Sequence, residues 1–186
     1  YVVNADGSGA TQLTSGDKSC DEPQWAPDGK RIAFLSKKFG ERNVWVMTPE
    51  GKAQAPITDM KSDVTSFKWS PDSIRIAYTA TDAPTDAEEK SKKDKNDARV
   101  VDENFKMSRL YVVPAATAAQ TMGQVLTTGD YNVPASGRAG YDWSPDAKTI
   151  VFTHTKTPLA DDWPSADLSF VEVATQKVRP FMATGA

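Results

Sequence analysis

Residues 25–34 read Trp-Ala-Pro-Asp-Gly-Lys-Arg-Ile-Ala-Phe, and residues 69–78 and 143–152 repeat this pattern closely. Each copy begins with Trp, Ser or Ala, Pro and Asp. Three mostly polar residues follow, and then Ile, a small apolar residue and Phe or Tyr. An internal repeat predicts a stack of similar units, because a single unit cannot bury its own apolar face. The repeat therefore determines the expected architecture before any single residue does.

Two further segments recur after each copy. A run of β-branched and aromatic residues, typical of a strand, lies at residues 43–47, 109–113 and 167–171, and residues 1–3 resemble the end of an earlier one. A shorter segment closes each unit, at residues 11–14, 55–58, 124–127 and 179–182. Four short strands in about 40–45 residues are typical of a β-propeller blade. A β-sandwich is the alternative, but a sandwich would not normally repeat its own sequence.

The sequence thus predicts an all-β fold, a partial β-propeller of four-stranded antiparallel blades. We expect one propeller domain over residues 1–186, with about three blades and two strands of another. Its predicted parts are the end of a preceding blade at 1–19, a blade at 20–60, a blade at 61–130 with a charged insertion at 79–108, and a blade at 131–186. A closed propeller needs about 4–8 blades, and the chain starts inside a strand without Met. We therefore expect a longer parent protein.

The turn between the first two strands of each unit has a physical basis. Pro presets φ at the first central position, Asp accepts local backbone hydrogen bonds, and Gly29 supplies a positive φ. Ser73 and Ala147 replace this glycine in the later copies. Because a Cβ is strained at positive φ, we expect the turn at Ala147 to relax. The recurring tryptophans are expected to be wedges between blades: Trp25, Trp45, Trp69 and Trp143.

Composition excludes several classes of protein. The chain has 186 residues, 39% of them hydrophobic, and a net charge of −3 without a long basic run, which argues against nucleic acid as the main partner. No apolar run approaches the roughly 20 residues of a membrane span. Cys20 is the only cysteine and His154 the only histidine, so we expect no structural metal and no cofactor. The compartment stays open between bacterial cytoplasm and periplasm.

The insertions fall on one predicted face. In a four-stranded meander, links from second to third strand and from fourth to first strand emerge on the same side. Both kinds of link grow along the chain, the first kind at residues 79–108 and 153–166 and the second kind at residues 128–142. Variable loops on a rigid scaffold usually carry function, although insertions are also tolerated there at little entropic cost. Within the first insertion, Thr85 and Glu88 have the spacing of a helix capping box.

Four residues of this face are candidates for ligand binding: Asp161, Asp162, Trp163 and His154. Two carboxylates beside an aromatic ring suit a cationic group, and Trp163 falls outside the repeat. The alternatives are solvated surface acids and a histidine that ends a strand with a local hydrogen-bond partner. A Gly-x-Ser-x-Gly motif is absent, so no catalytic residue is predicted in this segment.

The repeat resembles the propeller repeats shared by TolB-type proteins and the prolyl oligopeptidase family of serine peptidases. More distinctive resemblance, to acylaminoacyl- and dipeptidyl-peptidase-type members, lies in residues 21–28 (Asp-Glu-Pro-Gln-Trp-Ala-Pro-Asp), 32–36 (Ile-Ala-Phe-Leu-Ser), 98–102 (Ala-Arg-Val-Val-Asp) and 109–113 (Arg-Leu-Tyr-Val-Val). The resemblance implies a carboxy-terminal α/β-hydrolase domain with a Ser-Asp-His triad as partner. It also implies that the propeller admits short peptide substrates and excludes folded proteins.

Two other functions stay open at this point. The first is a TolB-like propeller that binds a protein or peptide partner as a scaffold. The second is a carbohydrate-active propeller, which would need catalytic acids or metal-binding histidines in its central funnel. A hydrolase domain in the parent protein would distinguish the peptidase from the scaffold.

Overall fold

Three four-stranded antiparallel sheets make up the computed structural model, which describes residues 1–95, 105–116, 120–134 and 140–181. In each sheet the strands follow one another in chain order. The first sheet contains β1 (Cys20–Trp25), β2 (Ile32–Ser36), β3 (Asn43–Met47) and β4 (Ala55–Pro56). The second contains β5 (Val64–Trp69), β6 (Arg75–Thr81), β7 (Ser108–Pro114) and β8 (Gln124–Val125). The third contains β9 (Tyr141–Trp143), β10 (Thr149–His154), β11 (Asp167–Glu172) and β12 (Val178–Pro180).

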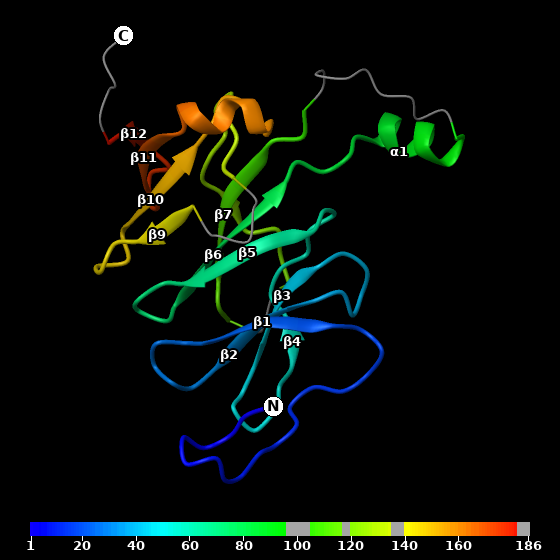
Figure 1. Cartoon of the computed structure of the whole chain (residues 1–186), viewed down its shortest axis with the longest axis vertical. Helices are drawn as coiled ribbons and strands as arrows, with labels where there is room; N and C mark the ends of the chain where they lie inside the picture. Colours follow the sequence, from blue (N-terminus) through cyan, green and yellow to red (C-terminus); the bar gives the residue numbers. More distant parts are fainter. Residues whose placement is uncertain (96–104, 117–119, 135–139, 182–186) are drawn as a thin grey trace.

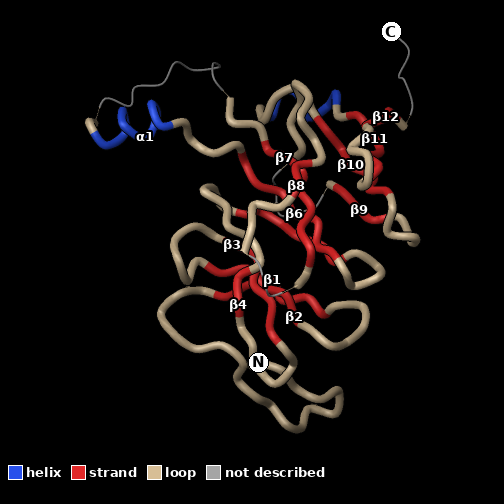
Figure 2. Tube along the Cα trace, turned by 180° about the vertical axis from the view of Figure 1, so that it is seen from behind, coloured by secondary structure: helices blue, strands red, loops and turns tan. Residues whose placement is uncertain are grey.

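The sheets succeed one another along the long axis of the molecule, from the blue and cyan sheet near the N-terminus to the orange and red sheet near the C-terminus (Figure 1). The same order is visible from behind (Figure 2). Helix α1 (Asp86–Lys93) lies to one side, and a 3₁₀ helix, η1 (Ala160–Ser165), precedes β11. No helix in the described part of the chain is both long enough and apolar enough to cross a membrane.

Apolar side chains fill the space between consecutive sheets. One cluster joins residues of the first and second sheets, among them Leu35, Val46 and Tyr78. A second cluster joins the second and third sheets, among them Leu110 and Phe152. β6 therefore has an almost continuous buried run, because both of its faces are covered, and a strand buried on both faces reads as unbroken hydrophobic sequence.

This arrangement confirms the predicted all-β, propeller-type fold. Three sheets stack in series, as blades do, rather than closing as the two layers of a sandwich. Before β1, Val2 and Thr11 exchange two backbone hydrogen bonds of 2.9 and 2.8 Å, as two strands of a further blade would. Val2 and Leu13 pack against Trp45 and Met47 of the first sheet. The boundaries assigned to each blade stay predictions.

The prediction that the turn at Ala147 relaxes is wrong. Ala147 keeps φ at +56°, close to the +61° of Ser73 and the +70° of Gly29. Its N–H donates to the carbonyl of Ser144 at 2.9 Å, and its own carbonyl accepts a hydrogen bond from Arg75 at 2.6 Å. Tertiary contacts thus hold the alanine in a conformation that costs about 1 kcal/mol.

The prediction that the recurring tryptophans are wedges between blades does not hold for Trp25 within the described chain, which has no further sheet on the Trp25 side. Trp45, Trp69 and Trp143 are buried, whereas Trp25 is 51% exposed. Trp69 and Trp143 are each covered by an arginine of the preceding sheet. In the described structure no such arginine lies in front of Trp25, so its ring faces solvent.

Candidate functional site

The links from second to third strand and from one sheet to the next lie together at one end of the sheets. We call this end the loop face; its described links are residues 37–42, 57–63, 82–95 with 105–107, 126–134, and 155–166. Direct contacts join them: the Arg42 N–H donates to Asp63 Oδ1 at 2.8 Å, and the Asn132 N–H donates to the Thr155 carbonyl at 2.7 Å. The expectation that these links share a face is confirmed.

The charged insertion enters the loop face through a capped helix. The Thr85 N–H donates to Glu88 Oε2 at 2.6 Å, and the Glu88 N–H donates back to Thr85 Oγ1 at 3.3 Å, which confirms the capping box. Lys106, on the returning arm, lies 2.7 Å from the same carboxylate. The Lys106 ammonium and the Thr85 donors lower the pKa of Glu88 to about 2. The predicted arm at residues 98–102 lies outside the described residues.

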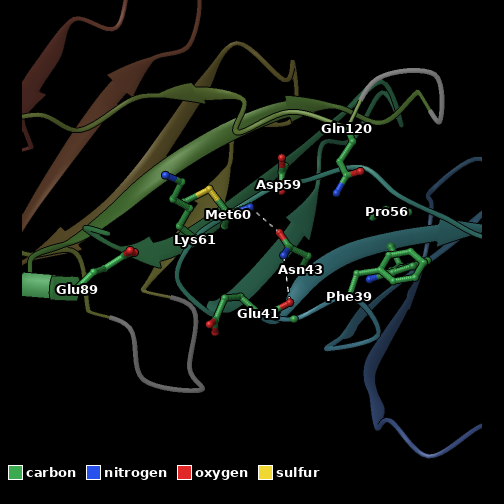
Figure 3. Close-up of a pocket in the computed structure, with 11 residues that line it drawn as sticks. Phe39, Glu41, Asn43, Pro56, Asp59, Met60, Lys61, Glu89 and Gln120 are labelled. Atoms are coloured by element: carbon green, nitrogen blue, oxygen red, sulfur yellow. Dashed lines mark hydrogen bonds between the residues drawn. The ribbon is translucent and has the colours of Figure 1, made fainter. Parts of the chain in front are cut away.

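A hollow of about 350 Å³ opens on the loop face between the first sheet and α1 (Figure 3). Its lining comes from separate segments of the chain: Phe39, Gly40, Glu41, Asn43, Trp45, Pro56, Asp59, Met60, Lys61, Glu89 and Gln120. Asn43 fixes its floor. Asn43 Oδ1 accepts hydrogen bonds from the Met60 N–H at 2.9 Å and from Thr58 Oγ1 at 2.8 Å, while Asn43 Nδ2 donates to the Glu41 carbonyl at 3.1 Å.

The charge and the rings of this hollow determine what it can bind. Three carboxylates, from Glu41, Asp59 and Glu89, oppose one ammonium, from Lys61. Phe39 is 74% exposed, and its ring centroid lies 5.2 Å from that of Trp45. The Lys38 ammonium already lies 5.9 Å from the Phe39 ring and 5.5 Å from the Trp45 ring, so the carboxylates, rather than the rings, are the part of the hollow that suits a further cationic group.

The residues predicted for ligand binding lie elsewhere on the loop face, in two places. Trp163 is 61% exposed on η1, and Asp161 is exposed beside it, while Asp162 accepts a hydrogen bond from Thr157 Oγ1. His154, at the end of β10, shares a hydrogen bond of 2.9 Å between its Nε2 and Ser169 Oγ. No contact recorded for the described residues joins His154 to the other three. Their role in binding stays a prediction.

The surroundings of His154 favour its neutral form. Its ring lies 4.8 Å from the ring of Tyr131 and 5.7 Å from that of Phe152. Burial lowers the pKa of His154, and the carboxylate of Asp167 opposes this shift. This is the environment of a strand-end histidine with a local hydrogen-bond partner.

The hollow beside α1 was not predicted from the sequence. Its residues come from the short link at 37–42, from β3 and β4, from the link at 57–63, and from Glu89 and Gln120 much further along the chain. The one local signal is the Phe39-Gly40-Glu41 triplet, an exposed aromatic residue within a polar link.

Sequence comparison finds relatives among bacterial peptidases. The chain is 30% identical over 171 residues to dipeptidyl-peptidase 5 of Porphyromonas endodontalis, an alignment that covers 84% of the chain and 25% of that protein. The resemblance to the peptidases is confirmed. The chain is also 27% identical over 169 residues to the uncharacterized peptidase YuxL of Bacillus subtilis, covering 87% of the chain and 26% of that protein. It thus spans about a quarter of the length of these relatives. No protein-family model matches it.

Solved structures support the propeller fold. TolB from Acinetobacter baumannii aligns with a TM-score of 0.56 at 16% identity, covering 98% of the chain and 37% of that protein. An oligogalacturonate lyase from Vibrio parahaemolyticus aligns with a TM-score of 0.62, also at 16% identity, covering 98% of the chain and 46% of that protein. At such low identity the peptidase-like chain shares only its fold with these proteins.

Proposed function

We propose that the chain is a non-catalytic propeller segment of a serine peptidase of the prolyl oligopeptidase type. In this proposal the propeller stands beside a separate α/β-hydrolase domain and controls which peptides reach the catalytic site of that domain. Short peptides are admitted, and folded proteins are excluded. The catalytic triad belongs to the hydrolase domain, which is the intramolecular partner of the propeller.

The observation that carries this proposal is the share of each relative that the chain matches. Both relatives are peptidases, and the chain corresponds to about a quarter of each. The matched quarter has the fold of TolB and contains the Trp-x-Pro-Asp repeats. The remaining three quarters leave ample length for a catalytic domain.

The loop face supports the proposed selection of peptides. The links that differ in length and sequence gather at this end of the sheets, and the acidic, aromatic hollow opens there. Loops on a rigid scaffold contact ligands more readily than the packed sheets beneath them. A peptide that passes this end would meet side chains that differ from one sheet to the next.

The geometry of the His154–Ser169 pair supports a non-catalytic segment. Ser169 is only 4% exposed, and its Oγ already shares a hydrogen bond with His154 Nε2. A nucleophile must approach the substrate carbonyl closely, which a buried hydroxyl between two sheets does not allow. The pair therefore stabilises β10 against β11.

Hydrolysis of substrates of increasing size by the complete parent protein tests the proposal. We expect kcat/KM to fall steeply from a dipeptide substrate to a long unstructured peptide and to a folded protein. Arg75→Ala, which loosens the second sheet from the third, should raise the ratio of kcat/KM for long peptides to that for dipeptides. The matched control is Lys148→Ala, at an exposed turn position, which should leave the ratio unchanged.

Two results would contradict the proposal. One is an unchanged ratio in the Arg75→Ala protein although its thermal midpoint has fallen. The other is peptide cleavage by the 186-residue chain alone that disappears on mutation of a residue within it. If the complete protein cleaves no peptide, the TolB-like scaffold becomes the better account, since the structural likeness to TolB covers 98% of the chain.

A further inference from the structure

A repeated contact joins consecutive sheets at their tight turns. The guanidinium carbon of Arg31 lies 5.1 Å from the ring centroid of Trp69, and Arg31 Nη2 donates to the Ser73 carbonyl at 2.5 Å. One sheet further, Arg75 lies 5.4 Å from the ring of Trp143 and donates to the Ala147 carbonyl at 2.6 Å. In both cases an arginine six residues after the Trp of one sheet covers the Trp of the next.

Each tryptophan also donates a hydrogen bond back to the preceding sheet, the sheet that supplies its arginine. Trp69 Nε1 donates to the carbonyl of Gln24 at 3.3 Å, and Trp143 Nε1 donates to the carbonyl of Lys68 at 3.3 Å. Each acceptor is the residue directly before the Trp of the preceding sheet. We call the arginine, the tryptophan and their two carbonyl acceptors the Trp–Arg clamp. A partly buried cation–π contact with two such hydrogen bonds makes a specific seam.

The first sheet carries the tryptophan and the backbone carbonyl of a further clamp, without the arginine. Trp25 occupies the clamp position but is 51% exposed. Gly29 occupies the position of Ser73 and Ala147 and shares their left-handed backbone, with φ at +70°, so its carbonyl is oriented as theirs are. The Trp25 indole has no hydrogen-bond acceptor among the described residues. The Trp25 face is therefore built like the two seams that are filled.

Residues 1–14 limit the size of what can cover this face. Val2 pairs with Thr11 on one side, and Val2 and Leu13 cover Trp45 and Met47 of the first sheet. On the other edge of residues 1–3, the described structure has no strand partner. Residues 1–14 thus already supply the third and fourth strands of a further sheet. Only the first and second strands of such a sheet fit beside Trp25.

We propose that the Trp25 face binds a β-hairpin of the same repeat type. Its arginine, six residues after its own Trp, stacks on Trp25 and donates to the Gly29 carbonyl, and its second strand pairs with residues 1–3. The third sheet of a second copy of the chain does not fit, because Thr149 stands at the arginine position and a whole sheet would meet residues 1–14. This inference is independent of the peptidase proposal.

The chain supplies the parts for a direct test. Tyr1 aligns with Trp45, so residues 20–44 of the chain, fused ahead of Tyr1, provide a hairpin, its arginine and a short link. With the Trp of the added segment replaced by Phe, the indole proton of Trp25 should exchange with solvent at least about tenfold more slowly than in the unextended chain. The matched control is Arg31→Thr in the added copy only, which should leave exchange close to the unextended rate.

The outcomes separate the possible occupants. Equal protection of Trp25 by the arginine and threonine extensions, or no protection by either, would overturn the proposal. The indole protons of Trp69 and Trp143 in the same spectra report whether the rest of the chain has folded. Analytical ultracentrifugation of the unextended chain tests whether a second copy of the chain occupies the Trp25 face instead. If the chain forms oligomers and Trp25→Ala converts them to monomers, the partner is a second copy, and the hairpin proposal is wrong.

Discussion

The two ends of the same strands are built in different ways. At the turn face, residues 26–31, 70–75 and 144–149, both seams use one arrangement of Trp, Arg and backbone carbonyls. At the loop face some backbone contacts recur as well, since the N–H groups of Arg42 and Ser108 donate to Oδ1 of Asp63 and Asn132, each at 2.8 Å, but the ion pairs around them differ. Arg42 bonds Asp21 and Glu22 beside the first sheet, whereas Arg109 contacts Asp82 and donates to the Tyr131 carbonyl at 3.1 Å beside the second.

This difference shows how a repeat protein separates stability from variation. Because recurring contacts hold the sheets together, the links of the loop face are free to differ in length and in side chains from sheet to sheet. Insertion, capped helix and hollow all lie there. The loop face is thus where selectivity for a ligand would be found.

The largest effect is expected from removal of a clamped tryptophan. Trp143→Ala removes a buried ring and leaves Arg75 without its stacking partner, which should lower the free energy of unfolding by about 3–5 kcal/mol. Urea denaturation measures this. Trp25→Ala is the matched control at the same position of the repeat. Trp25→Ala should lower the free energy of unfolding by less than about 1 kcal/mol. If both substitutions lowered it equally, the clamp would not be what makes Trp143 stabilising.

Loss of the clamp arginine should have the next largest effect. Arg75→Ala removes a hydrogen bond from a charged donor to the Ala147 carbonyl and the contact with Trp143, at a cost of about 1.5–3 kcal/mol. Arg75→Lys should recover only part of this stability, because an ammonium lacks the planar fork that stacks and donates together. Full recovery by lysine in the same denaturation assay would mean that charge alone holds the seam.

A smaller effect is expected from the titration of His154 at the loop face. Burial lowers its pKa in the folded state, so the unfolded chain binds the proton more readily. Stability should therefore fall as pH drops through the ordinary histidine range near about 6.5. Because His154 is the only histidine, His154→Gln should flatten the dependence of the urea midpoint on pH in this range. An unchanged slope would place the titrating group elsewhere.

The smallest effect on the whole molecule is expected in the insertion. Thr85→Ala removes the helix cap and should destabilise α1 locally by about 0.5–1 kcal/mol. Hydrogen exchange of the α1 amides should quicken, while the global urea midpoint stays unchanged, since no sheet residue caps this helix. A shift of the global midpoint as large as that of Arg75→Ala would mean that the insertion is part of the seam.

The sequence predicted what depends on local repetition. The strands follow from the alternation and composition of each repeat, and the capping box from Thr85 and Glu88 three positions apart. The errors at Trp25 and Ala147 have a tertiary origin: the neighbouring sheet decides whether a tryptophan is covered and whether an alanine holds a positive φ. The hollow was missed for the same reason, because Phe39 and Glu89 meet only in the folded chain.

Exchange of the tryptophan indole protons in the unmodified chain tests the central claim most directly. The claim is that recurring Trp–Arg clamps hold the seams of this propeller segment and that Trp25 carries an unfilled one. The account predicts slow exchange for Trp69 and Trp143, which are 7% and 9% exposed, and fast exchange for Trp25. Exchange at Trp69 and Trp143 as fast as at Trp25 would contradict it.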